Sequence, residues 1–218
     1  FTMGNVAAAQ EMAFESNIGA LCDGNPRMTQ RLVQTNLIYG AYPVAEKYIA
    51  VLENTFYYKD WAKAQRKFLY NDEAVETDPL LGNMRRNLLA ENHLIQMDGF
   101  DTDLIRLAEQ NPSNKAAFHY AGVFYLLAKD MTRFKTLVET YYGTDLLPSL
   151  PVSFQEAVII LSEKDPDYWK RFGVSESIVG RFTDYKRQVL AGRNNSNALP
   201  GLMYRSYGDT YWYYYMFK

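Results

Sequence analysis

The chain has 218 residues, of which 48% are hydrophobic and 22% are charged. This composition is typical of a globular protein and excludes a disordered one. The 23 basic and 25 acidic residues give a formal net charge of −2, so we expect no nucleic-acid partner. The single cysteine, Cys22, excludes an internal disulfide framework. No apolar run is long enough to span a membrane, and the start is not a signal peptide.

Helical periodicity recurs along the chain and strand-like alternation is nearly absent, which predicts an all-α fold. The segment "VAEKYIAVLENT" places Val44, Tyr48, Val51 and Leu52 on one face of a helix. A further helix is expected near 58–70. The later segment "AAFHYAGVFYLLAK" is apolar on most of its circumference, which predicts a helix packed on several sides.

Two later helices are predicted from the residues that would begin and end them. In "SFQEAVIILSEK", Ser153 is a candidate N-cap with Glu156 three residues later, the pattern of a capping box. The helix in "SESIVGRFTDYKRQVLAG" is predicted to begin after Ser175 and to end at Gly192. Its apolar stripe consists of Ile178, Phe182, Tyr185 and Val189.

The chain closes on "GDTYWYYYMFK", which has six aromatic residues among its last eight. This run is too short and too rich in tyrosine to span a membrane, and it would promote aggregation if it were exposed. We therefore expect a short terminal helix, capped by Asp209 or Thr210 and largely buried. Tyr211, Tyr214 and Tyr215 would share one of its sides.

An irregular internal repeat is also present. "FTMGNVAAAQEMAF" aligns without a gap on "LIYGAYPVAEKYIA", which places Gly4 on Gly40, and segments around Gly99 and Lys129 fit the same frame. The separations are 36, 59 and 30 residues. In each unit a small or turn residue would link two helices, and apolar residues two and five positions later would pack the second helix on the first.

The segment "GAYPVA" resembles the Gly-x-Tyr-x-x-Ala segment of the tetratricopeptide repeat, and Asn111-Pro112 resembles the closing proline of that repeat. The resemblance implies an irregular tetratricopeptide-like array of helical hairpins, an α-α superhelix. We predict one helical repeat domain over 1–218, with hairpins over 1–145 and a C-terminal helical extension over 146–218. Because the first unit lacks most of its first helix, we expect an upstream part of the protein.

The whole chain is also similar to the C-terminal region of a family of uncharacterised Bacteroides-type proteins, a domain of unknown function. "RLVQTNLIYGAYPVAEKYI", "FQEAVIILSEKDPDYWKRF" and "ALPGLMYRSYGDTYWYYYMFK" carry this similarity. It implies a multi-span membrane region upstream, so the domain would be membrane-attached and would face either the periplasm or the cytoplasm. The membrane would be a partner only through that upstream segment.

Motifs for catalysis or for metals are not found. His93 and His119 lack the spacing of a zinc-binding pair, and neither they nor Cys22 has a partner that the sequence identifies. No phosphate-binding glycine loop and no nucleophile elbow occurs. We therefore predict no catalytic residue, no metal site and no cofactor.

These observations favour a non-enzymatic protein-interaction or scaffold domain that binds another protein or a peptide in the concave groove of the array. The candidate groove residues lie on the helices before Gly40 and before Lys129. They are Arg31, Gln34, Asn36, Tyr39, His119, Tyr120 and Phe124.

A second hypothesis is an accessory module that binds carbohydrate or an envelope polymer. It depends on the aromatic and basic segments "YWKRF" and "RFTDYKRQ" and on the asparagine-rich "GRNNSNALPGL". A third alternative is an enzyme whose site is assembled in space and leaves no local motif.

Overall fold

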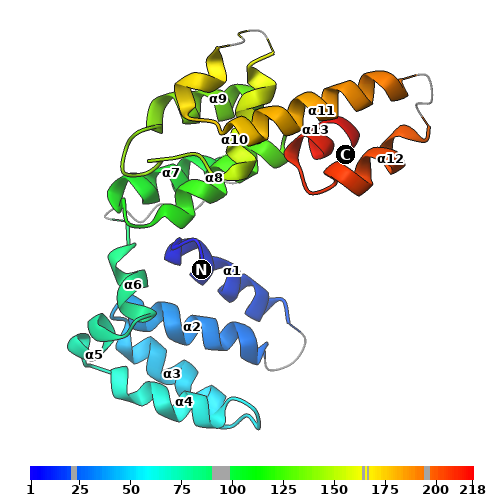
Figure 1. Ribbon diagram of the computed structural model, residues 1–218. Coiled ribbons are helices and arrows are strands. Elements are labelled where there is room, and N and C mark those ends of the chain that lie inside the picture. The colour runs from blue at the N-terminus through cyan, green and yellow to red at the C-terminus, as the bar shows by residue number, and fades with distance from the viewer. Residues whose placement is uncertain (21–23, 90–98, 164, 166, 194–196) are drawn as a thin grey trace. The chain divides into compact units, whose positions relative to one another are not determined.

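The computed structural model describes residues 1–20, 24–89, 99–163, 165, 167–193 and 197–218 (Figure 1). Within these ranges the secondary structure is helical: thirteen α-helices and two short 3₁₀ helices occur, and no strand does. This confirms the predicted all-α class. The chain divides into two compact units, Phe1–Tyr120 and Ala121–Lys218, and each is described by itself.

The first unit consists of short helices that pack mainly on their neighbours in the sequence. Its elements are α1 (Val6–Ile18), α2 (Pro26–Ile38), α3 (Tyr42–Glu53), α4 (Lys59–Gln65), η1 (Arg66–Phe68), α5 (Asp72–Thr77), α6 (Leu81–Arg86), α7 (Phe100–Gln110) and the first turns of α8 (Lys115–Leu127). The helix expected near 58–70 is therefore present as α4 and η1.

The predicted turn positions of the repeat have an unusual backbone. Gly4, Gly40 and Lys129 have φ values of +84°, +73° and +55°, and they precede α1, α3 and α9 (Met131–Tyr141). A residue without a side chain adopts this conformation at little cost, whereas Lys129 adopts it with some strain. Gly99 has a φ of −123°, so the fourth alignment position is not the same turn.

The packing positions of the α2–α3 hairpin also agree with the sequence pattern. Ala45 is fully buried and Tyr42 is 8% exposed, and both belong to the core of the first unit. The same core includes Val33, Leu37, Ile49 and Leu52 from the two helices. The glycine turn thus allows α3 to fold back on α2 and bury both apolar faces.

Arg85 of α6 donates hydrogen bonds to backbone carbonyls at the C-terminal end of α2. Its guanidinium donates to the carbonyl oxygens of Leu37 at 2.9 Å and Ile38 at 3.0 Å, and to the Asp72 carboxylate at 2.9 Å. The Tyr42 hydroxyl donates to the same carboxylate. The last carbonyls of a helix have no hydrogen-bond donor within the helix. Arg85 donates to two of those of α2, and its contacts with Tyr42 and Asp72 join α2 to α3, α5 and α6.

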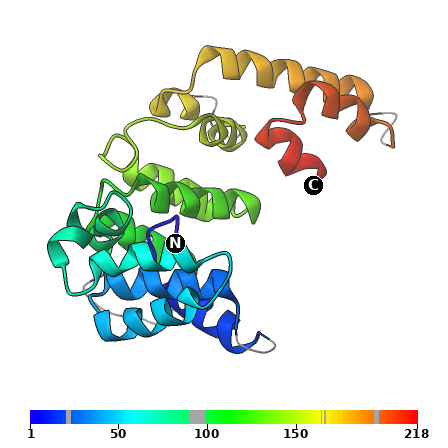
Figure 2. The same cartoon turned by 90° about the horizontal axis from the view of Figure 1, so that it is seen from below.

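The second unit begins within α8 and holds a long helix against shorter ones (Figure 2). Its further elements are α9, α10 (Val152–Leu161), η3 (Tyr168–Phe172), α11 (Glu176–Gly192), α12 (Leu199–Tyr207) and α13 (Tyr211–Phe217). Helix α11 begins after Ser175 and ends at Gly192, as predicted.

The capping box predicted at Ser153 is wrong. Helix α10 begins at Val152 with Pro151 as its N-cap residue, and no side chain caps it. Proline fixes the backbone for helix entry, so Ser153 lies inside the first turn. Glu156, the other half of the expected box, is 4% exposed and makes a tertiary hydrogen bond instead.

The aromatic C-terminus forms the predicted terminal helix, α13, and Thr210 caps it by accepting a hydrogen bond from the backbone N–H of Tyr213. Trp212 is 1% exposed, and Tyr211 and Tyr213 are also buried. The Tyr211 ring contacts the rings of Tyr214 and Tyr215, as expected for three residues on one side of the helix.

Candidate functional site

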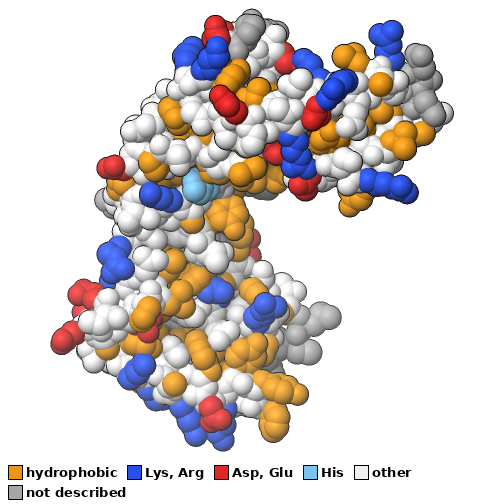
Figure 3. Space-filling model, in the orientation of Figure 1, with side chains coloured by type: hydrophobic (Ala, Val, Ile, Leu, Met, Phe, Trp, Pro, Cys, Tyr) orange, Lys and Arg blue, Asp and Glu red, His pale blue; other side chains and the backbone are white. Residues whose placement is uncertain are grey.

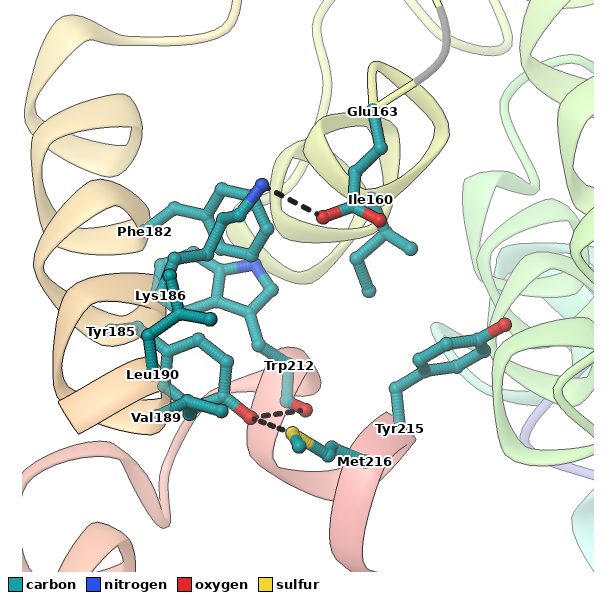
Figure 4. Close-up of a pocket in the computed structure, with 10 residues that line it drawn as sticks. All are labelled: Ile160, Glu163, Phe182, Tyr185, Lys186, Val189, Leu190, Trp212, Tyr215 and Met216. Carbon is teal, nitrogen blue, oxygen red and sulfur yellow. Dashed lines mark hydrogen bonds and ion pairs between the residues drawn. The ribbon is translucent and has the colours of Figure 1, made fainter. Parts of the chain in front are cut away.

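An apolar cavity of about 320 Å³ lies in the second unit between α10, α11 and α13 (Figure 4). We call it the aromatic pocket. Its lining residues are Ile160, Glu163, Phe182, Tyr185, Lys186, Val189, Leu190, Trp212, Tyr215 and Met216.

Trp212, Phe182 and Tyr185 form one wall of the pocket, which we call the aromatic wall. The ring centroid of Trp212 lies 5.1 Å from that of Phe182 and 5.9 Å from that of Tyr185. The indole N–H donates to the carbonyl oxygen of Glu156 at 2.9 Å, which fixes the orientation of the ring. A hydrogen bond between α10 and α13 therefore positions this wall, and its acceptor, Glu156, does not line the cavity.

Tyr185 connects α11 to α13 beside the cavity. Its hydroxyl donates to the carbonyl oxygen of Trp212 at 3.3 Å and lies 3.2 Å from the sulfur of Met216. Burial raises the pKa of the Tyr185 phenol to about 12, with a smaller contribution from Tyr213. The hydroxyl thus remains protonated at neutral pH and acts as a hydrogen-bond donor.

The two charged residues that line the pocket lie together at one end of it. The Lys186 ammonium lies 3.0 Å from the Glu163 carboxylate, and both side chains are about half exposed. The same ammonium lies 5.7 Å from the centre of the Phe182 ring. Figure 4 shows this ion pair at one end and Tyr215 across the cavity from the Phe182 and Trp212 side.

The rim of the pocket is apolar and accessible to solvent. Leu190 is 60% exposed, Met216 is 50% exposed and Tyr215 is 37% exposed. A second hollow of about 520 Å³ shares Ile160, Glu163 and Tyr215 with the pocket. It adds charged side chains, namely Lys135, Glu139, Asp165 and Arg171. An apolar cavity with a few polar groups at its edge is the usual form of a binding site.

The predicted groove residues on α2 differ in their surroundings. Arg31 donates to the amide oxygen of Gln34 at 2.7 Å, and its guanidinium stacks over the Phe1 ring at 4.0 Å. Asn36 is 4% exposed, donates to the carbonyl of Leu32 and accepts from Gln10. Tyr39 packs against the core of the first unit, and burial raises the pKa of its phenol.

The predicted groove residues on α8 lie on both sides of the division between the units. Tyr120 and Phe124 are 48% and 42% exposed. Burial, together with nearby Lys115, lowers the pKa of the His119 imidazole. Arg31 and Gln34 are thus brought together by a hydrogen bond, and the role of all seven residues in binding stays a prediction.

Several residues named from the sequence cannot be placed. Cys22, His93 and the asparagines at 194 and 195 lie outside the described residues. Among the residues that are described, no group of three or more His, Cys, Asp or Glu side chains is arranged to hold a metal ion. No described helix has both the length and the apolar character needed to cross a membrane.

Sequence reasoning identified the aromatic stripe of α11 and the buried tail, but not the cavity between them. The missed lining residues are Ile160 of α10, Glu163, which follows the end of α10, and Lys186 of α11, which pairs with Glu163. A usable signal was the apolar Leu190, which directly follows the stripe residue Val189 and is largely exposed.

The architecture defines a helical protein whose neighbouring helices pack in pairs, with an apolar pocket near its C-terminus. The chain belongs to DUF6057, a family of unknown function, whose model matches residues 1–218. No curated protein and no solved structure matches the chain.

Proposed function

We propose that this chain is a non-enzymatic binding domain that accepts a bulky apolar side chain of a partner protein in the aromatic pocket. The observation that carries this proposal is the open cavity of about 320 Å³ with an apolar rim. Partner proteins commonly anchor a helix or peptide by inserting such side chains into grooves of this kind.

The walls of the pocket support insertion of a side chain. The contacts of Trp212 with Glu156 and of Tyr185 with the Trp212 carbonyl hold the walls in place before any partner arrives. A preorganised site loses little conformational entropy on binding. The exposed Leu190 and Met216 at the rim would be covered by the partner, so their apolar area would contribute to affinity.

The second hollow supports a peptide rather than a free apolar molecule. It meets the aromatic pocket at Ile160, Glu163 and Tyr215, and it places Lys135 and Arg171 beside Glu139 and Asp165. A segment that alternates an apolar anchor with polar or charged residues would match both hollows. We infer an amphipathic segment of a partner protein as the occupant.

A photo-crosslinking residue, benzoylphenylalanine, at position 190 tests this proposal in cells that make the full protein. The matched control is position 202, because Leu202 is 62% exposed but does not line the pocket. We expect one protein to crosslink at 190 and not at 202. The purified partner should bind the Leu190→Asp variant at least about tenfold more weakly than the unmodified chain, since ~1.4 kcal/mol corresponds to tenfold. Equal crosslinking at the two positions would contradict the proposal.

A further inference from the structure

The first unit exposes two adjacent aromatic side chains in the connection between α3 and α4. Phe56 is 90% exposed and Tyr57 is 87% exposed, more than any other large hydrophobic residue described. Their rings contact each other edge to face, with centroids 5.1 Å apart. We call this pair the aromatic tip. It lies outside the aromatic pocket and is not explained by the proposed function.

The residues on both sides of the tip hold the connection in place. The Thr55 hydroxyl donates to the carbonyl of Leu52 at 2.7 Å and accepts from the backbone N–H of Tyr58 at 3.3 Å. Tyr58 and Trp61 pack against the core of the first unit. The inward-facing rings therefore anchor the loop, while Phe56 and Tyr57 point outward from a fixed base.

Basic side chains follow the tip directly. Lys59–Phe68 contains four basic residues and one acidic residue, although the chain as a whole has a net charge of −2. One of the four, Arg66, is paired with Glu53 and Glu46, so the lysines supply the remaining positive charge. Lys59 and Lys63 are both exposed and lie one helical turn apart on the same face of α4. Figure 3 shows hydrophobic side chains that project at the end of α4 nearest this loop, and basic side chains along its outer edge.

The size of the tip argues against a protein as its primary partner. A stable protein interface buries about 1,200–2,000 Å² in total, whereas each aromatic side chain supplies only ~150–250 Å². Aromatic rings do, however, partition into the interfacial region of a bilayer, and lysines beside them are attracted to anionic headgroups. The combination is complementary in charge and in polarity to an anionic lipid surface.

We propose that the aromatic tip inserts into the interface of an anionic membrane, with Lys59 and Lys63 contacting the headgroups. The two rings would enter the boundary between headgroups and acyl chains, and α4 would lie along the surface. The contact is peripheral and reversible, because two side chains and two charges are far weaker than a membrane-spanning helix.

Co-sedimentation of the full chain with vesicles tests this inference. We expect binding to phosphatidylcholine vesicles that contain phosphatidylglycerol, little binding to phosphatidylcholine alone, and weaker binding as salt is raised. The double variant Phe56→Ser/Tyr57→Ser should bind at least about tenfold more weakly, and so should Lys59→Gln/Lys63→Gln. Leu202→Ser, which removes an exposed apolar residue elsewhere, should bind like the unmodified chain.

A Phe56→Trp variant supplies a direct signal of insertion. Its fluorescence emission should shift to shorter wavelength, relative to the unmodified chain, when phosphatidylglycerol vesicles are added. Melting temperatures of all variants should match, because the changed side chains are exposed. The inference is overturned if the chain does not bind phosphatidylglycerol vesicles or if the serine double variant binds them equally. It is also overturned if the unmodified chain binds a protein rather than vesicles through this site and the serine double variant loses that protein.

Discussion

The carboxylate of Glu156 accepts the backbone N–H of Tyr211 at 2.7 Å, and the carbonyl oxygen of the same glutamate accepts the indole N–H of Trp212 at 2.9 Å. One residue of α10 thus holds two consecutive residues of α13. The carboxylate lies at the first turn of α13, where backbone N–H groups have no partner within the helix. This contact positions the aromatic wall of the pocket.

Replacement of Glu156 by glutamine is expected to change the pH dependence of stability. Burial raises the pKa of the Glu156 carboxyl, although the Tyr211 N–H and Arg181 oppose this effect. Its folded-state pKa is therefore above the unfolded value of about 4.3. Ionisation then costs the folded state more than the unfolded state. The wild-type chain therefore loses stability relative to Glu156→Gln as pH rises from the unfolded-state pKa to the folded-state pKa.

Urea unfolding of both chains between about pH 4 and about pH 7 measures this difference. The free energy of unfolding of Glu156→Gln minus that of the wild type should increase with pH. At neutral pH, Glu156→Ala should be less stable than Glu156→Gln by about 1–3 kcal/mol, because alanine leaves the buried Tyr211 N–H without an acceptor. The exposed Glu176→Gln is the control. A stability difference that is independent of pH would contradict a raised pKa for the Glu156 carboxyl.

Deletion of residues 211–218 is expected to unfold the second unit or cause precipitation. The Tyr211 and Tyr214 hydroxyls donate to the carbonyls of Leu126 and Leu127 at the end of α8, so the deletion also removes partners of α8. Trp212→Ala alone should destabilise the chain by about 3–5 kcal/mol through loss of a buried side chain. Thermal unfolding measures both effects, and removal of Lys218 alone is the control. An unchanged melting temperature would show that the tail is not structural.

Gly122→Ala is expected to destabilise the second unit by about 1–3 kcal/mol through overpacking. A Cβ atom at position 122 would lie within 2.8 Å and 3.1 Å of ring atoms of Phe154, with a third ring atom closer still. The Phe154 ring is 1% exposed and packs edge to face on Phe134, so it has little room to move. Helix α8 therefore needs a glycine where α10 crosses it.

A double-mutant cycle with Phe154→Leu checks this explanation by urea unfolding. The smaller side chain should relieve the clash, so the cost of Gly122→Ala should fall in the Phe154→Leu background. If the cost is the same in both backgrounds, the contact with the Phe154 ring does not cause it; helix propensity does not cause it either, because it favours alanine over glycine.

Arg85→Ala is expected to destabilise the first unit by about 1.5–3 kcal/mol, the range for hydrogen bonds to charged groups. The substitution removes the Arg85 donor from the Ile38 carbonyl and from the Leu37 carbonyl, of which the second also accepts from the backbone N–H of Gly40. Arg85→Lys should recover only part of the loss, because an ammonium cannot reproduce the planar fork of the guanidinium. The exposed neighbour Arg86→Ala is the control in chemical denaturation. Equal effects of the two alanine substitutions would contradict the capping role.

The same network predicts weaker stability in acid. Hydrogen bonds from Tyr42 and Arg85 hold the pKa of the Asp72 carboxyl below its ordinary value. Because the folded-state pKa is depressed, the contribution of this group is present at neutral pH and is lost as pH falls through the folded pKa. Arg85→Ala should therefore reduce the dependence of unfolding free energy on pH in the acid range.

The local features of the chain followed from its sequence. Helical periodicity gave the all-α class, the apolar stripe and its flanking residues placed α11, and Thr210 was a recognisable cap for α13. The turn at Gly40 was predictable because a left-handed backbone between two apolar helices favours glycine. These properties depend on neighbours within a few residues, and such neighbours are visible in the sequence.

The tertiary structure alone decided which distant residues meet. Glu156 suited a capping box in the sequence, yet it binds Tyr211, 55 residues further along the chain. Similarly, the sequence does not show that Ile160 and Leu190 border one cavity, or that Phe56 stays exposed while Tyr58 packs inward. Burial and pairing of this kind depend on how helices pack against one another, and the periodicity of a single helix does not encode that arrangement.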